Sequence, residues 1–246
     1  MADWDDRTRQ GFGSVPRAGG DVASRTTYDA GLRKYMLSIY NYMTSGVLLT
    51  GIVALLTAQS GLAVTLASGP LMWIVALSPL AIVFAMSFGA QKFSRGTLQI
   101  MFWGFATLMG LSLSTLFLVY TGGSIAATFF ATAGAFAGLS LFGYTTKKDL
   151  SGWGSFLIMG VIGILIAMVI NMFLQSAALE LAVSILGVLI FAGLTAYDTQ
   201  RLKNDYQRLR GTSWEGKSII LGALSLYLDF INMFLFLLRF MGVARE

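Results

Sequence analysis

Two aspartates carry the clearest chemical signal in this chain of 246 residues. Asp198 and Asp229 lie in long apolar stretches, and a carboxylate at the centre of a bilayer costs about 2.5–3.5 kcal/mol to insert. Ser225 and Asn232 flank Asp229 at helical spacing, so these three side chains share one face of a helix. Tyr197 directly precedes the other acid. The pattern predicts a cavity lined by polar groups.

The two carboxylates predict a proton switch that needs no histidine. Carboxylates within about 3–5 Å of each other cannot both ionise readily, so such a pair shares one proton. Their depths conflict, however, because Asp198 precedes Lys203 by about 7.5 Å of helix while Asp229 follows Lys217 by about 18 Å. The acids therefore meet only if the helix of Asp198 penetrates more deeply, or if the helix of Asp229 starts outside the bilayer.

The residues that are missing exclude several classes of enzyme. The chain has no histidine and no cysteine, which excludes a Cys/His zinc site, a Ser-His-Asp triad and a thiol nucleophile. An intramembrane aspartyl protease is the remaining alternative, since such enzymes use two aspartates on adjacent helices. Tyr197-Asp198 fits the first motif of that class, but Asp229 lacks the Gly-x-Gly-Asp context of the second. We therefore expect no enzymatic activity and no cofactor.

The composition places these acids inside a membrane. Hydrophobic residues make up 56% of the chain and charged residues 12%, about half the charged share of a soluble domain. Uncharged stretches cover residues 35–91, 96–146 and 150–179, and a helical span needs about 20 residues. Dividing them at glycine and proline gives five spans: Tyr35–Thr57, Leu71–Ala90, Leu98–Tyr120, Ser124–Gly143 and Trp153–Leu174. Two further apolar segments follow, Leu181–Asp198 or slightly beyond and Ile219–Phe240, so the sequence predicts an all-α polytopic protein with seven spans.

The basic residues predict the orientation of these spans. Lysines and arginines occur in residues 1–34 and in the loops after spans two, four and six, whereas the other three loops contain none. The positive-inside rule therefore places the N-terminus in the cytoplasm. Seven crossings would leave the C-terminus outside, yet Arg239 and Arg245 lie there. Either these two charges are tolerated outside, or the last segment is re-entrant.

The remaining features concern the tail and the helix contacts. Residues 1–34 have mixed charge and no apolar run of a signal peptide, which predicts a disordered cytoplasmic tail before a transmembrane domain at 35–246. The basic loops predict contact with the lipid bilayer and its anionic headgroups, and no nucleic acid partner. Gly134-x-x-x-Gly138 has the small-xxx-small pattern that is typical of close helix packing.

Two segments resemble the Bax inhibitor-1 family, also called the transmembrane Bax inhibitor motif family. They are FAGLTAYDTQRLK at Phe191–Lys203 and GALSLYLDFINMFLFLLRFMG at Gly222–Gly242, of which the second, with LYLDFIN followed by LLR, is the more specific. The resemblance implies a seven-helix bundle whose last helix is central. It also implies that Asp198 and Asp229 are the family's paired aspartates, coupled to a basic residue near the end of span two, where Lys92 or Arg95 would fit.

The resemblance and the paired acids together predict a pH-sensitive calcium leak in a bacterial inner membrane. Calcium prefers six to eight oxygen ligands, so Asp198 and Asp229, supported by Ser225, Asn232 and backbone carbonyls, would form a weak site suited to passage. The resemblance to bacterial relatives also supports an alternative without transport. In that alternative, the protein regulates a membrane-bound quality-control protease through its N-terminal tail.

Overall fold

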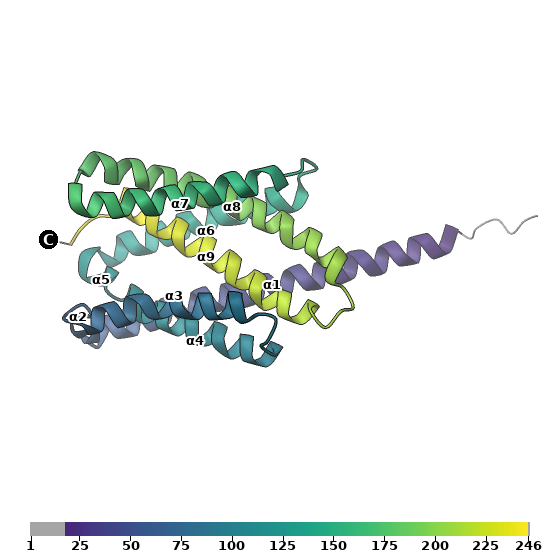
Figure 1. Ribbon diagram of the computed structural model, residues 1–246, viewed down its shortest axis with the longest axis horizontal. Coiled ribbons are helices and arrows are strands. Elements are labelled where there is room, and N and C mark those ends of the chain that lie inside the picture. Colours follow the sequence, from purple (N-terminus) through teal and green to yellow (C-terminus); the bar gives the residue numbers. More distant parts are fainter. Residues whose placement is uncertain (1–17, 246) are drawn as a thin grey trace, which may run out of the picture.

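The computed structural model describes residues 18–245, with side chains described from residue 28 onward. This part of the chain is helical, and its only β-type pairing is one isolated bridge. The helices are α1 (Ala18–Gln59), α2 (Leu62–Leu66), α3 (Leu71–Gly89), α4 (Arg95–Leu113), α5 (Leu116–Val119), α6 (Gly122–Thr145), α7 (Ser151–Leu174), α8 (Ala177–Leu209) and α9 (Glu215–Met241) (Figure 1). The all-α prediction is confirmed.

Seven of these segments are long and apolar enough to cross a membrane. Each coincides with a predicted span, and α4 and α5 together form the third one, Arg95–Val119. Helices can satisfy all of their backbone groups within one segment, which is what a lipid environment demands. The predicted bounds agree to within a few residues except for α1 and α8, which are much longer than expected.

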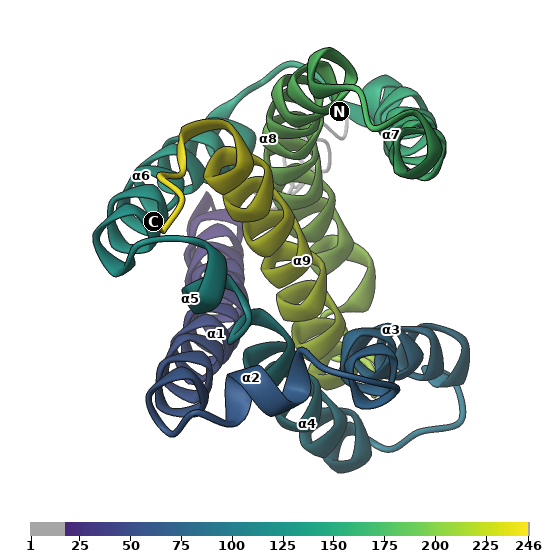
Figure 2. The ribbon, with the colours of Figure 1, turned by 90° about the vertical axis from the view of Figure 1, so that its left-hand side faces the viewer.

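The last helix is the centre of the bundle. In its most apolar window, 72% of the residues of α9 are buried, against 11% for α3 and for α7. Helices α1, α4, α6 and α8 all pack against α9, and Figure 2 shows α9 between them while α3 and α7 lie at the periphery. The expectation of a central last helix is therefore confirmed.

The N-terminal part of α1 lies within residues 1–34, the predicted tail. Residues 18–34 are helical, while residues 1–17 lie outside the described part of the chain. The extended end of α8 supplies the reason, because the ring of Tyr206 lies 5.5 Å from that of Tyr28 and 5.2 Å from that of Tyr35. Aromatic packing between two overlong helices therefore orders a segment whose composition resembles that of a tail.

The C-terminal segment shows that α9 crosses the bundle completely. Residues after Gly242 lie beside the turn between α5 and α6, where the Thr121 amide donates to the Val243 carbonyl at 3.1 Å. Tyr120 pairs with Ala244, and the Arg245 side chain donates to the Phe117 carbonyl at 2.9 Å. The last described residues thus lie at the end of the bundle opposite to the start of α1 (Figure 1), so the last segment is not re-entrant.

The close helix contacts use other glycines than the predicted pair. A Cβ added at Gly134 or Gly138 would meet only open space, so this small-xxx-small pattern was a wrong prediction of packing. A Cβ added at Gly143, one turn further along α6, would instead collide with the backbone of Ala196 in α8. Glycine is required at that position because two helix backbones touch there.

Candidate functional site

The hairpin of α8 and α9 brings the two aspartates to similar heights. Asp198 lies eleven residues, about 17 Å, before the end of α8, and Asp229 lies fourteen residues, about 21 Å, after the start of α9. Residues 210–214 connect the two helices. The conflict of depths expected from the sequence is absent, because α8 continues for six residues beyond Lys203.

Asp198 is held in a closed ring of three polar groups. Its side chain is buried, and its Oδ1 forms an ion pair with Nη1 of Arg201 at 3.2 Å. The hydroxyl of Ser225, on α9, donates to the other carboxylate oxygen, and Nη2 of Arg201 donates to that hydroxyl at 3.2 Å. Arg201 also lies over the ring of Tyr197, 5.7 Å from its centroid. The carboxylate of Asp198 is therefore paired with a guanidinium group through one oxygen and with a hydroxyl group through the other.

Asp229 has no such support. It is equally buried, and its Oδ2 atom has no hydrogen-bond partner among the residues that the structure describes. Asp229 follows Ser225 by one turn of α9, and the hydroxyl of Ser225 donates to Asp198. A buried polar atom without a partner is costly. Binding of a proton or a cation at this oxygen would remove that free-energy cost.

The other predicted site residues divide into two groups. Ser225 and Tyr197 lie beside the acids as expected, but the Asn232 amide donates to the Leu228 carbonyl of its own helix at 2.8 Å. Among the described residues, Lys92 and Arg95 form no ion pair with either aspartate. Arg95 lies beside Gly216, at the start of α9.

Arg201 is the basic partner that the sequence reasoning missed. Its spacing of three residues from Asp198 on a continuous helix places both on one face, and this signal was available. The prediction placed the basic residue near the end of span two, at Lys92 or Arg95, because the family resemblance implied it. With α8 extended to Leu209, the arginine becomes a helical neighbour.

Tyr227 and Gln200 hold the hairpin in place. The hydroxyl of Tyr227 bonds to that of Thr50 at 2.7 Å, and Thr50 donates to the Ala106 carbonyl at 2.8 Å, which links α9 to α1 and α4. Gln200 accepts from the Leu150 amide and donates to the Lys148 carbonyl, each at 2.8 Å, which fixes the connection between α6 and α7. These buried bonds make the aspartates part of a rigid frame.

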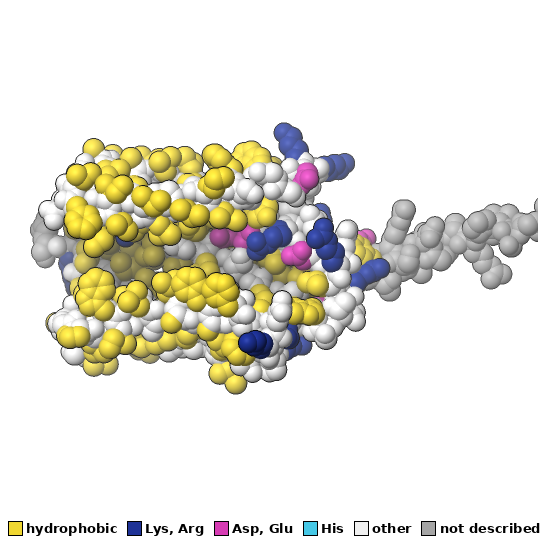
Figure 3. All heavy atoms as spheres, in the orientation of Figure 1, with side chains coloured by type: hydrophobic (Ala, Val, Ile, Leu, Met, Phe, Trp, Pro, Cys, Tyr) yellow, Lys and Arg dark blue, Asp and Glu magenta, His cyan; other side chains and the backbone are white. Residues whose placement is uncertain are grey.

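A cavity reaches the site from the cation-rich end of the bundle. It has a volume of about 390 Å³, lies between α3, α8 and α9, and is lined by Arg201, Asp205 and Ser225. Figure 3 shows acidic and basic side chains in the hollow between the two halves of the bundle. The cavity therefore reaches Arg201 and Ser225, the partners of Asp198, although most of its lining is apolar.

A second cavity lies at the opposite end of the hairpin. It measures about 440 Å³ and is lined by Asn171, Glu180 and Arg239, among others. Between this cavity and the aspartates, the rings of Phe191 and Phe236 stack with centroids 5.9 Å apart. The two cavities are thus separated by an apolar contact.

The site offers few ligands for a metal ion. In the part of the chain that is described, no cluster of three or more histidine, cysteine, aspartate or glutamate residues is placed to hold a metal ion. Two carboxylates and one hydroxyl offer fewer oxygens than the six to eight that calcium prefers. The chemistry available is proton exchange and transient cation coordination.

Comparison with known proteins places the whole bundle in one family. The family model described as inhibitor of apoptosis-promoting Bax1 matches residues 32–246. The inner membrane protein YbhL of Escherichia coli K12 is 47% identical over 94% of this chain and 98% of its own length. An uncharacterized protein of Caulobacter vibrioides is 46% identical over 95% and 96%, and one of Rickettsia prowazekii is 44% identical over 92% and 96%. The chain is therefore an integral membrane protein that belongs to the Bax inhibitor-1 family.

Proposed function

We propose that this protein is a pH-sensitive calcium leak in which Asp198 and Asp229 form the proton switch. The observation that carries the proposal is the buried Oδ2 atom of Asp229, which has no partner among the described residues and lies beside the ring of Asp198, Arg201 and Ser225. A proton shared between the two carboxylates would satisfy this oxygen and remove one negative charge. Loss of the proton leaves a charge that must attract a cation.

The arginine determines what happens when the proton leaves. Arg201 is bound to Asp198, but its side chain is 41% exposed toward the cavity, so it has room to move. When both carboxylates are charged, they compete for the one guanidinium, and a calcium ion entering from the cavity provides the missing positive charge. The conductance therefore changes over the pH range in which the pair gains or loses its proton.

The phenylalanine pair is the proposed gate. Apolar constrictions block ions because the ions would have to shed water without receiving other ligands. Phe236 lies directly over Gly187 of α8, and its ring stacks on that of Phe191. Small movements of α9 relative to α8 would separate these rings and join the two cavities.

We also propose that the N-terminus lies in the cytoplasm and that the membrane is a bacterial inner membrane. Three connections at the N-terminal end of the bundle carry lysines and arginines, whereas those at the other end carry none. The printed name of the Escherichia coli relative supports the inner membrane. Ser213, exposed between α8 and α9, is the test position. In intact cells, a cysteine introduced by Ser213→Cys should not react with an impermeant thiol reagent. Labelling from outside would show that this loop does not lie in the cytoplasm and would contradict the proposed topology.

Flux measurement in liposomes tests the proposed activity. The purified full-length protein should admit calcium into indicator-loaded liposomes, with a rate that changes between about pH 5 and 8 and exceeds that of protein-free liposomes. A regulator of a membrane protease without transport activity predicts no flux at any pH. A correctly folded protein that admits no calcium would therefore contradict the leak and favour the regulatory alternative.

A further inference from the structure

A large groove opens between α1 and α6, away from the paired aspartates. Both helices pack against α9, but they make no extensive contact with each other, and Figure 2 shows them on the same side of α9. The resulting groove, here called the α1–α6 groove, has a volume of about 870 Å³ and includes Phe230 of α9 among its lining residues. Pockets of about 300–1,000 Å³ typically accommodate most of a small ligand.

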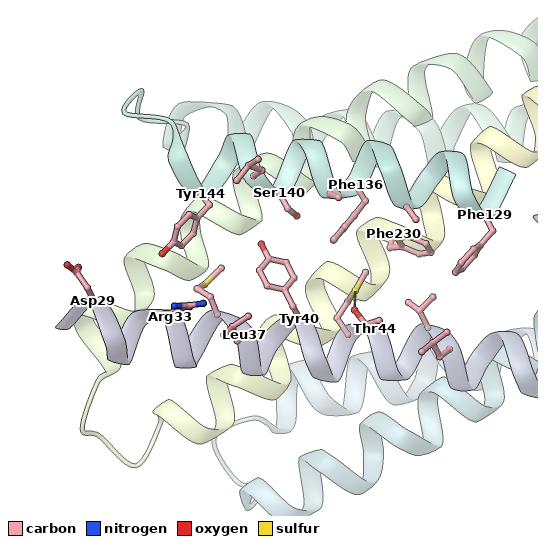
Figure 4. A pocket seen from close by; sticks show the side chains of 17 residues that line it. Asp29, Arg33, Leu37, Tyr40, Thr44, Phe129, Phe136, Ser140, Tyr144 and Phe230 are labelled. Carbon is pink, nitrogen blue, oxygen red and sulfur yellow. Dashed lines mark hydrogen bonds between the residues drawn. The ribbon is translucent and has the colours of Figure 1, made fainter. Parts of the chain in front are cut away.

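The α1–α6 groove is polar at one end and apolar along the rest of its length. Arg33, Tyr40 and Tyr144 lie together at the cation-rich end, whereas Phe136 and Phe129 line the groove further along (Figure 4). From Arg33 to the far part of the α1 lining, the helix covers about 21 Å. One leaflet of a bilayer has about 15 Å of hydrocarbon, half of the core. The groove thus matches a headgroup followed by an acyl chain.

The charges at the polar end favour a negative headgroup. Among the described residues, Arg33 forms no ion pair, although Asp29 lies one turn away on the same helix. A second cation is near, since Lys203 lies over the ring of Tyr144, 5.0 Å from its centroid, and donates to its carbonyl at 2.8 Å. Basic pockets between transmembrane helices bind anionic lipid headgroups.

The side chains of α6 explain why the groove stays open. Between Phe129 and Tyr144, the α6 lining includes the small side chains of Ala133, Ala137 and Ser140, at intervals of four and three residues. A neighbouring helix would normally pack against such small side chains, yet α1 is too far away to do so. The space is therefore left for a flexible apolar chain.

We propose that the α1–α6 groove binds one anionic glycerophospholipid, with its phosphate at Arg33 and an acyl chain along Phe136 and Phe129. The ligand lies parallel to the helices, as lipids of the same leaflet do. Because the groove borders α9, an occupied groove supports the central helix on the side that α6 and α1 leave open.

Lipid retention tests this proposal on the full-length protein. Native mass spectrometry should show phosphatidylglycerol retained several-fold more than phosphatidylcholine with identical acyl chains. Arg33→Gln should reduce that preference about fivefold, the contribution of one basic side chain to binding of anionic lipid. Lys34→Gln is the matched control, because Lys34 is exposed on the same helix but does not line the groove.

Filling the groove provides the second arm of the test. Ala137→Phe should lower retention of both lipids, whereas Ala135→Phe, on an exposed face of α6 outside the groove, should leave it unchanged. The proposal is overturned if wild type retains both lipids equally, or if Lys34→Gln acts as strongly as Arg33→Gln. It is also overturned if Ala137→Phe retains lipid as wild type does. A melting temperature near that of wild type confirms folding of each variant.

Discussion

The central hairpin of α8 and α9 differs from the peripheral helices α3 and α7 in burial and in charge. Nearly three quarters of the α9 window is buried, while α3 and α7 bury about a tenth of theirs. The hairpin carries Asp198, Asp229 and Arg201, whereas the described spans α3 and α7 contain no charged residue. The most apolar window of α8 is only 28% buried, but Asp198 and Asp229 themselves lie on buried faces of the hairpin.

This contrast shows where sequence change should matter. A peripheral helix needs only to be apolar and long enough, because lipid tolerates many shapes. The hairpin has to satisfy buried polar groups and keep backbones in contact at the same time, so substitutions there should have large effects.

The largest expected effect is on the phenylalanine pair. Phe236→Ala should raise calcium flux into liposomes at least about tenfold, equivalent to a barrier lowered by ~1.4 kcal/mol, because the apolar contact with Phe191 is lost. Phe173→Ala is the control, since Phe173 on α7 is 84% exposed. Unchanged flux through a folded Phe236→Ala protein would show that the pair is only packing.

A smaller effect is expected where α6 touches α8. Gly143→Ala should cost about 1–3 kcal/mol of stability, because its Cβ meets the backbone of Ala196, which cannot move aside as a side chain would. Gly138→Ala, on an open face of the same helix, should stay within about 0.5 kcal/mol of wild type. Thermal unfolding in detergent compares the two variants. Equal losses of stability in the two variants would mean that the close approach of the α6 and α8 backbones at Gly143 adds no cost of its own.

The smallest effect is expected in the loop before the peripheral helix α7. Hydrogen bonds from Ser151 hold the pKa of Asp149 below its ordinary value, and the Ser151 amide donates at 2.9 Å. A carboxyl whose pKa is lowered on folding stabilises the fold above its unfolded pKa of about 3.9 and loses this contribution as the pH falls through the folded pKa. Asp149→Asn should therefore lower the melting temperature slightly at pH 7, and the decrease should become smaller as the pH falls below the unfolded pKa. A decrease that stays the same as the pH is lowered would contradict the assignment.

The sequence predicted the features that the membrane imposes. All seven spans and both buried acids could be found, because a bilayer requires long uncharged helices and makes every internal charge conspicuous. The central position of α9 came only from the family resemblance, although the polar face with Asp229 is consistent with it. These features depend on one helix at a time.

The features that depend on two helices could not be predicted. The length of α8 is one such feature, because its extension beyond the predicted span packs against α1 through Tyr206. The packing pattern at Gly134 pointed to the wrong glycine, since composition alone does not show which face of α6 meets α8. The α1–α6 groove is likewise a property of the distance between helices.

Calcium flux of aspartate variants as a function of pH tests the central claim most directly. If Asp198 and Asp229 share a proton, Asp198→Asn and Asp229→Asn should each flatten the pH dependence between about pH 5 and 8, and the double variant should add little, because coupled sites are not additive. Asp149→Asn, outside the spans, should retain the wild-type profile. The account is contradicted if the two single variants shift the profile independently and their effects sum in the double variant.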